Sequence, residues 1–242
     1  MVRLVEPLEW DTEFFGFPIG RVALDGATQE ALEAIEFEAR ELGLRCLYAS
    51  VDPTAPGDVA YLAQGAGYRL VEPTLTWNRP NTTYTPPSTA CVVRRGTAED
   101  LTFLTEAVAT VAPWSRFGAD PRFGTEAALR MHGAWLERAV SCGDERMLTI
   151  AEDDSGVTGF ATQVRGNPAN FDLMGVTKPG TGVSQALLAA FFDWAGEAAV
   201  EAGPTAARNI AITRFLENAG FRVTRARYVF HRWFDDDRGA QQ

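Results

Sequence analysis

A short glycine-containing turn is the part of the sequence best suited to chemistry. The stretch from Leu173 to Leu188 passes from a strand-like segment, through Gly180-Thr-Gly182-Val-Ser184, into an Ala-rich apolar segment. Glycines let successive backbone N–H groups converge without a Cβ clash, and a helix start adds unpaired donors and a positive dipole end. Such a turn can hold a pyrophosphate. Alone, a Gly-x-Gly pair is also typical of a plain strand-to-helix turn.

A second pattern begins at Asn209 and ends at Gly220-Phe221, with a helix-like segment between them. An Asn at a helix start is usually an N-cap, and a Gly after a helix is usually its stop signal. Their combination with the upstream glycine turn is far more restrictive than either one alone.

Two further groups could act on a substrate. Asp172 precedes the glycine turn in its strand and is a candidate general base, the alternative being an ordinary surface or hydrogen-bonded carboxylate. Ser115, Arg116 and Phe117 follow a predicted helix in a loop, where substrate contacts concentrate. Arg116 suits either bidentate binding of a phosphate or a structural ion pair.

The elements that must position these residues fall into two parts, separated by a proline-rich segment from Arg79 to Thr89 that indicates a linker. The first part predicts the order β-α-β-α-β, with Trp10, Phe14 and Phe15 in its core. Its strands are expected at 19–24, 45–51 and 68–71, and its helices at 28–42 and 59–65.

The second part predicts a hairpin at its centre, over 146–164, with an Asp-Asp-Ser-Gly turn. A capping box, Thr97 to Asp100, opens one helix, and His132 is expected on the surface of another. Strands are predicted at 91–95 and 171–176, a short strand region at 203–208, helices at 97–111, 125–140, 183–202 and 210–218, and β-rich sequence at 222–234. This is an α+β arrangement.

With this order of elements, the sequence resembles the GNAT superfamily of N-acyltransferases. The family's acyl-CoA motif, a Gln or Arg and then Gly-x-Gly-x-Gly/Ala, is similar to the turn from Gly180 to Ser184. Its second motif, Asn-x-x-Ala…Tyr…Gly-Phe, is similar to Asn209 with Gly220-Phe221.

A narrower resemblance covers nearly the whole chain. The segments Leu8-Glu-Trp-Asp, Phe14-Phe-Gly, Ser115-Arg-Phe117 and Asp120-Pro-Arg-Phe123 are similar to the two-part GNATs that acetylate nucleotide-linked amino sugars, such as the dTDP-fucosamine acetyltransferases.

The resemblance implies an α/β (α+β) GNAT fold, with a mixed central sheet flanked by helices and a smaller GNAT-like N-terminal half. The implied domains are a truncated GNAT-like domain at 1–80, a linker at 81–89 and an acyl-CoA-binding catalytic domain at 90–242. The implied reaction is direct attack of a small-molecule amine, such as that of a nucleotide-linked amino sugar, on acetyl-CoA. Ser115, Arg116 and Phe117 are expected to bind the acceptor. The residues expected to bind acetyl-CoA are Val176, Lys178, Gly180, Thr181, Gly182, Val183, Ser184 and Asn209.

The sequence departs from the family pattern where chemistry is concerned. Pro179 stands in place of the usual Gln or Arg, although Lys178 is adjacent, and Leu216 stands in place of the proton-donating Tyr. General acid catalysis contributes about 10²–10⁴-fold, so this loss slows an acyl transfer without forbidding it. Two alternatives stay open: an acyltransferase of secondary metabolism that uses a longer acyl-CoA or a carrier-protein thioester, and a non-catalytic acyl-CoA-binding protein.

Composition bounds the remaining expectations. Among 242 residues the net charge is −10, which argues against a nucleic-acid partner because phosphate binding needs a basic face. Cys46, Cys91 and Cys142 are too widely spaced for a disulfide framework or a metal cluster. The sequence shows no secretory signal. It also has no apolar run that approaches the length of ~20 residues needed to span a membrane. We expect a cytoplasmic, metal-free monomer or homodimer, with an amine acceptor and, in the alternative, an acyl carrier protein as partners.

Overall fold

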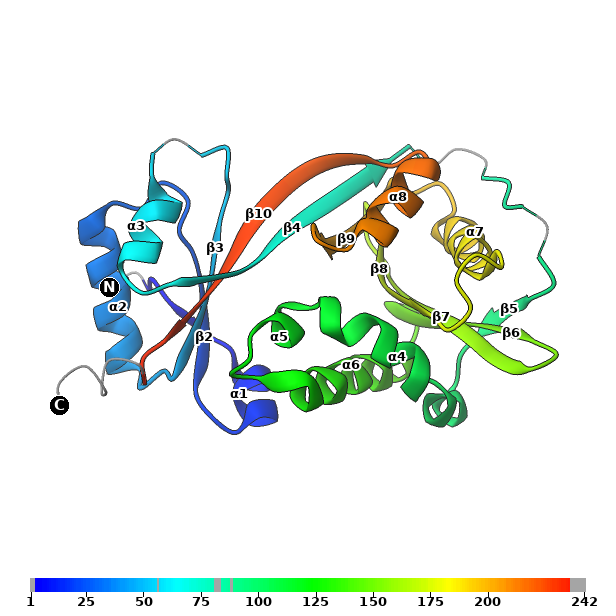
Figure 1. Ribbon diagram of the computed structural model, residues 1–242, viewed down its shortest axis with the longest axis horizontal. Helices are drawn as coiled ribbons and strands as arrows, with labels where there is room; N and C mark the ends of the chain where they lie inside the picture. The colour runs from blue at the N-terminus through cyan, green and yellow to red at the C-terminus, as the bar shows by residue number, and fades with distance from the viewer. Residues whose placement is uncertain (1–2, 56, 81–83, 88, 236–242) are drawn as a thin grey trace. The chain divides into compact units, whose positions relative to one another are not determined.

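The computed structural model describes residues 3–55, 57–80, 84–87 and 89–235 (Figure 1). The strands are β1 (Glu6–Pro7), β2 (Ile19–Ala23), β3 (Cys46–Val51), β4 (Arg69–Arg79), β5 (Val92–Arg95), β6 (Arg146–Asp153), β7 (Gly156–Val164), β8 (Ala169–Val176), β9 (Val200–Ala206) and β10 (Arg222–Trp233). The α-helices are α1 (Glu9–Phe15), α2 (Gln29–Glu41), α3 (Val59–Gly65), α4 (Thr105–Val111), α5 (Arg116–Ala119), α6 (Gly124–Ser141), α7 (Val183–Ala195) and α8 (Ile210–Asn218). Two 3₁₀ helices, η1 (Ala98–Phe103) and η2 (Ala112–Trp114), flank α4.

The strands form a mixed sheet in the order β1-β2-β3-β10-β4-β9-β8-β7-β6-β5. The pairs β2–β3 and β8–β9 are parallel, and the hairpin β6–β7 is antiparallel as the sequence predicts. Within the described residues, no helix combines the length and the apolar character needed to cross a membrane.

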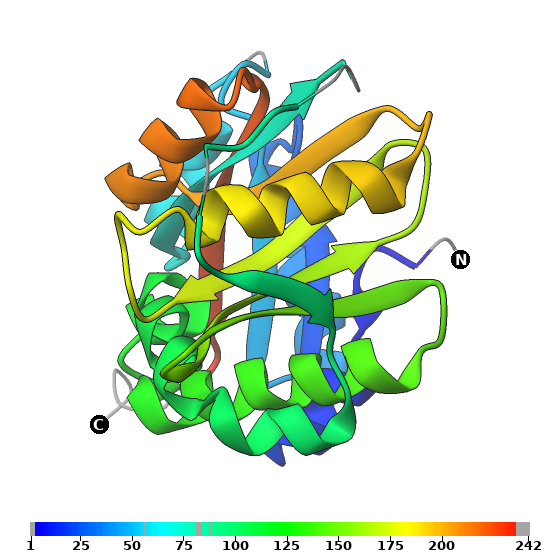
Figure 2. The same cartoon turned by 90° about the vertical axis from the view of Figure 1, so that its right-hand side faces the viewer.

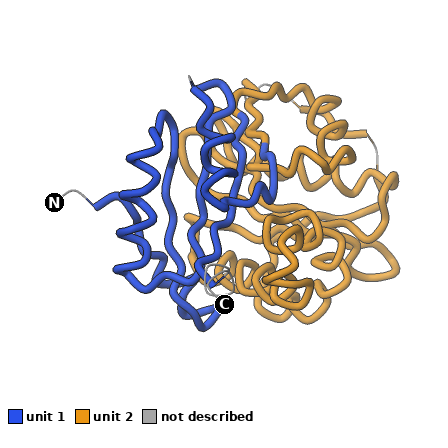
Figure 3. The backbone as a smooth tube through the Cα atoms, turned by 60° about the vertical axis from the view of Figure 1, so that its left-hand side comes forward, with its two compact units in different colours: residues 1–74, 226–242 blue, residues 75–225 orange. Residues whose placement is uncertain are grey.

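The chain divides into two compact units (Figure 3). Unit 1 comprises residues 1–74 and 226–242, and unit 2 comprises 75–225. These borders differ from the expected 1–80, 81–89 and 90–242, because the second half of β10 pairs with β3, from Tyr228 opposite Val51 to Trp233 opposite Cys46. Residues 81–83 and 88 of the expected linker lie outside the described part of the chain.

Unit 1 contains the predicted strands and helices and one helix that the sequence did not reveal. Helix α2 begins as predicted at Thr28, whose hydroxyl accepts a hydrogen bond from Ala31 N at 3.3 Å. Helix α1 is the unpredicted one, and none of its residues is buried. Its Trp10 stacks on Phe14 at 5.3 Å and stays 38% exposed, so the predicted core position of Trp10 is wrong.

Unit 2 places α7 on one face of its strands and α4 and α6 on the other (Figure 2). The predicted capping box is present, with both Thr97–Asp100 bonds formed at the start of η1. His132 of α6 is only 1% exposed, and its Nδ1 lies 2.7 Å from Ala128 O, which corrects the expected surface position.

The predicted helix over 183–202 is too long. Helix α7 ends at Ala195, because Gly196 adopts a φ of 63° and breaks the helical path. Strand β9 then occupies Val200–Ala206 instead of the short region expected at 203–208. The Ala-rich sequence favours a helix by propensity, but Val200 and Ala202 are fully buried in the sheet, and this burial outweighs propensity.

Candidate active site

Strands β8 and β9 separate partway along their length. Their parallel ladder pairs Ala169 with Val200 and ends where Phe171 pairs with Ala202. Beyond that pair, β8 continues to Val176 and β9 to Ala206. The backbone of β8 from Asp172 to Val176 is therefore released from β9 on one edge while β7 still holds the other edge. Free N–H and C=O groups on such an edge can bind an extended ligand as an added strand.

Asp172 occupies a bulge at the point where the two strands separate. In the β7–β8 ladder, Thr162 lies opposite Leu173 and Gln163 lies opposite Phe171, so Asp172 lies opposite no residue of β7. A bulge of this kind redirects a side chain. Arg146 Nη1 approaches the carboxylate of Asp172 at 3.5 Å from β6. Leu173, the next residue, packs with the cluster beneath α4 and α6.

The environment of Asp172 favours its neutral form. Surrounding protein atoms desolvate the carboxyl and raise its pKa, although Arg146 and the Thr162 hydroxyl oppose the shift. The side chain still keeps 36% of its surface exposed, so solvent or a ligand can reach it. A carboxylate with a raised pKa near a strand edge is suited to accept a proton at neutral pH.

The predicted pyrophosphate turn has the backbone that such a ligand needs. Gly182 is the N-cap of α7 at a φ of 87°, and no side chain caps the helix. The first N–H groups of α7 are therefore without a side-chain cap and remain suited to an anion. Gly180 has a φ of 82°, and no atom lies within 4 Å of where its Cβ would be. Val183 is buried behind the turn, at 3% exposure, and Ser184 follows in the first helical turn.

Bonds outside the glycine motif hold this turn. Lys178 Nζ pairs with Asp153 Oδ2 at 2.7 Å and also bonds Ser155, in the β6–β7 turn. Thr181 Oγ1 donates to Lys178 O at 2.7 Å, and Thr89 Oγ1 donates to Thr181 O at 3.3 Å. Lys178 thus positions the turn by an ion pair, and neutral backbone N–H groups are left to meet a phosphate.

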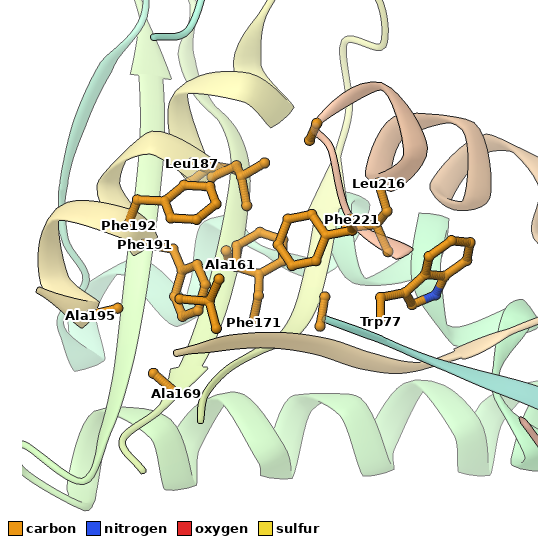
Figure 4. Close-up of a cluster of buried hydrophobic side chains, with 14 of the residues drawn as sticks. Trp77, Ala161, Ala169, Phe171, Leu187, Phe191, Phe192, Ala195, Leu216 and Phe221 are labelled. Atoms are coloured by element: carbon orange, nitrogen blue, oxygen red, sulfur yellow. The ribbon is translucent and has the colours of Figure 1, made fainter. Parts of the chain in front are cut away.

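The second motif supplies a cap and a core residue. Asn209 Oδ1 accepts from Ile212 N at 3.3 Å, which is the capping role, and its predicted contact with CoA stays a prediction. Leu216 is 0% exposed and belongs to the cluster that also contains Trp77 and Phe221 (Figure 4). An aliphatic side chain in this cluster can pack but cannot donate a proton.

The three predicted acceptor-binding residues have different surroundings. Ser115 is the N-cap of α5, accepting from Gly118 N at 3.2 Å and donating to Ala112 O at 2.8 Å. The guanidinium of Arg116 lies 4.8 Å from the ring centre of Phe117. Phe117 itself is 0% exposed, so its placement supports a packing role and not the predicted contact with a substrate.

Sequence reasoning missed a contact at the open end of the separated strands. Arg208, just after β9, donates from Nη2 to Pro113 O at 2.7 Å and lies 5.2 Å from the ring centre of Trp114. The partners are about a hundred positions apart, and no local pattern joins them. Arg146 was missed for the same reason, although the hairpin register brings it near the end of β7. Among the described residues, no group of three or more His, Cys, Asp or Glu is placed to hold a metal.

Comparison with known proteins gives a likeness of fold. No family model matches the sequence, and no curated protein matches it significantly. A GCN5-related N-acetyltransferase from Sphaerobacter thermophilus is 17% identical with a TM-score of 0.60, covering 95% of this chain and 76% of that one. A tandem GNAT protein from the clavulanic acid biosynthesis pathway is 20% identical with a TM-score of 0.52, covering 89% and 75%. A conserved protein of unknown function from Staphylococcus epidermidis is 13% identical with a TM-score of 0.61, covering 90% and 84%.

At these low sequence identities, the similarity shows a shared architecture. The order of elements, the mixed sheet flanked by helices and the neighbours agree with the fold expected from the sequence. The chain has a GNAT fold, which it shares with a tandem GNAT protein.

Proposed function

We propose that the protein is an N-acetyltransferase of the GNAT type, which transfers the acetyl group of acetyl-CoA to the amine of a small molecule. The observation that carries the proposal is the free edge of β8, followed directly by the uncapped N-terminus of α7. An amide-containing chain can pair with the edge while its pyrophosphate meets the turn from Gly180 to Ser184. Open space at Gly180 supports this fit.

In the proposed reaction, the amine nitrogen attacks the thioester carbonyl, the new C–N bond forms and the C–S bond breaks. Holding both reactants in one place accounts for about 7–11 kcal/mol of the barrier reduction. Asp172, directly or through one water, accepts the proton that the amine loses. Its raised pKa brings it closer to the pH at which it works, which favours proton transfer.

The reaction also develops negative charge on the carbonyl oxygen and on the departing sulfur, and each charge must be stabilised. A backbone N–H on the free edge of β8 stabilises the oxyanion of the tetrahedral intermediate. The departing thiolate, with a pKa of about 8.5 if it resembles a cysteine thiol, leaves without a side-chain acid, and solvent protonates it. Leu216 at the position of the family's Tyr makes this step slower than it would be with a donor.

The proposal also names the chemical class of the amine acceptor. The resemblance to nucleotide amino sugar acetyltransferases supports an amino sugar that carries a nucleotide, with Arg116 as a predicted contact. Cytoplasmic location and a metal-free reaction belong to the same expectation. All the residues proposed to bind acetyl-CoA, from Val176 to Asn209, belong to unit 2.

One observation favours a second candidate. Since Leu216 is fully buried and carries no proton, the same fold could bind an acyl-CoA without turnover. A third candidate is an acyltransferase of secondary metabolism that uses a longer acyl-CoA or a carrier-protein thioester. It is favoured by a structural neighbour from the clavulanic acid biosynthesis pathway.

Calorimetry with CoA and acetyl-CoA, followed by single-turnover release of free thiol in the presence of amines, separates the acetyltransferase from the non-catalytic candidate. We expect acetyl-CoA to bind and an amino sugar to release thiol. Binding without release from any amine would support the non-catalytic candidate, and no binding by the folded protein would refute the site.

A further inference from the structure

The segment before β5 contacts the turn from Gly180 to Ser184, although it lies far from the glycine motif in the sequence. Thr89 Oγ1 donates to Thr181 O at 3.3 Å, and the two residues are 92 positions apart. Figure 2 shows the chain passing the start of α7 on its way to β5. Earlier in the same segment, Tyr84 contacts Phe192 of α7, with the ring centres 5.2 Å apart. This segment therefore packs on α7 and touches the turn that precedes it.

The surroundings of the Thr89 hydroxyl direct its proton to this turn. Its oxygen accepts a hydrogen bond from Cys91 N at 3.3 Å, which occupies one lone pair. Thr181 O and Cys91 Sγ each lie 3.3 Å from the same oxygen as acceptors for its proton. Because sulfur is a weak acceptor and a backbone carbonyl a strong one, the proton favours Thr181 O. Thr89 also packs on Gly182, where a Cβ would lie 3.1 Å from Thr89 Cβ.

This bond fixes the orientation of the peptide between Thr181 and Gly182. Gly182 has a φ of 87°, and glycine adopts positive and negative φ about equally readily. Its own backbone therefore does not decide which way the preceding peptide faces. A peptide is planar and trans, so its C=O and its N–H point in opposite directions. While Thr89 holds the carbonyl, the Gly182 N–H points away from Thr89, and a flip of the peptide would exchange the two groups.

We propose that Thr89 is a positioning residue for the acetyl donor, which holds the Thr181–Gly182 peptide so that the Gly182 N–H faces the pyrophosphate. The inference rests on the proposed binding of acetyl-CoA at this turn and adds the residue that sets the conformation of the turn. A backbone N–H attracts a phosphate oxygen, whereas a carbonyl oxygen in the same place repels it. A peptide already held in the binding orientation needs no reordering when the donor binds, which strengthens binding.

Calorimetry with CoA on variants of the full chain tests the inference. Thr89→Val keeps the shape of the side chain and its packing on Gly182 but removes the hydroxyl. Since one hydrogen bond is lost, CoA should bind roughly 2- to 10-fold more weakly. Thr89→Ser keeps the hydroxyl and should keep most of the affinity. Thr102→Val is the matched control, because Thr102 Oγ1 also donates to a backbone carbonyl, Glu99 O at 3.1 Å, and its loss should leave CoA binding unchanged.

Pantetheine distinguishes a role at the turn from a general loss of structure. It carries the amide arm and the thiol of CoA without the phosphates, so it has no group for the Gly182 N–H to bind. Thr89→Val should therefore leave the affinity for pantetheine unchanged while the affinity for CoA falls. Where an amine is acetylated, the same variant should raise KM for acetyl-CoA by the same factor and leave kcat nearly unchanged.

The outcomes separate this inference from the proposed function. With a parent protein that binds CoA, the inference would be overturned by unchanged CoA affinity of Thr89→Val, or by an equal loss in Thr89→Ser or Thr102→Val. A matching loss of pantetheine affinity in Thr89→Val would also overturn it, because the effect would then not depend on the phosphates. A parent protein that binds no CoA would instead refute the proposed function, and the inference would fall with it.

Discussion

Replacing Leu216 tests whether this position belongs to the core or faces the thioester. The side chain is 0% exposed in a cluster with Trp77 and Phe221. Leu216→Ala removes most of a fully buried side chain and should cost about 2–5 kcal/mol of the free energy of unfolding. Leu216→Tyr adds volume to a filled space, about 1–3 kcal/mol, and buries an unpaired hydroxyl, about 1–3 kcal/mol more. The tyrosine that the family pattern calls for should therefore destabilise this protein about as much as alanine does.

Urea unfolding of the two variants and the parent measures these changes. Leu216→Met keeps the volume and should cost less than about 1.5 kcal/mol. Val223→Ala, at a 47% exposed site, should change the free energy of unfolding by no more than about 0.5 kcal/mol. Single-turnover rates with acetyl-CoA complete the assay. If Leu216→Tyr keeps the parental stability and speeds thiol release, Leu216 faces the donor and its assignment to the core is wrong.

Substitutions at three further positions probe the donor turn and the base. Gly182→Asp forces a side chain onto a φ of +87°, 3.1 Å from Thr89 Cβ, and sets a carboxylate where a phosphate binds, so calorimetry should detect no CoA binding by the folded variant. Unchanged affinity would move the donor site elsewhere. Lys178→Met removes the ion pair with Asp153, which should weaken CoA binding several-fold yet cost only about 0.2–1 kcal/mol of stability, since the pair is partly exposed. Lys178→Arg should restore the affinity, and a loss as complete as that of Gly182→Asp would mean a direct phosphate contact. Asp172→Asn should abolish most of the proton acceptance and lower the rate by about 10²–10⁴-fold. Burial raises the pKa of Asp172 in the folded state above its ordinary value of 3.8. Between the unfolded-state pKa and the higher folded-state pKa, the folded state binds more protons than the unfolded state. The free energy of unfolding therefore falls as the pH rises through this range. The Asn variant should thus gain stability relative to the parent at neutral pH, and pH-dependent urea unfolding that shows no such gain would contradict the proposed environment.

Local sequence signals predicted most elements well. The observed bounds of α3 and α8 are those predicted from the sequence. Each helix is followed by a glycine at positive φ, Gly67 or Gly220, which ends it. The helix over 183–202 was overextended because Ala-rich sequence gives no local sign that Val200 enters the sheet. Helix α1 was missed because it is short and its side chains have no apolar periodicity to reveal it.

The candidate site could be predicted only where its residues are adjacent in the sequence. The turn from Gly180 to Ser184 could be recognised because its glycines and the following helix are adjacent in the chain. Contacts set by register could not be recognised. The bulge at Asp172, its approach by Arg146 and the bond from Arg208 to Pro113 all depend on strand pairing or on loops far apart in sequence.

The split composition of unit 1 has a consequence for the order in which the chain can fold. Its first segment, 1–74, leaves the ribosome before any of unit 2, but β3 gains its β10 partner only after residues 75–225 have been made. Phe230 and Phe234, from that late segment, also fill the hydrophobic core of unit 1. Until then the nascent chain exposes an unpaired strand edge and an incomplete apolar cluster, the features that recruit chaperones and promote aggregation. Synthesis of unit 1 therefore begins before that of unit 2 and is completed after it.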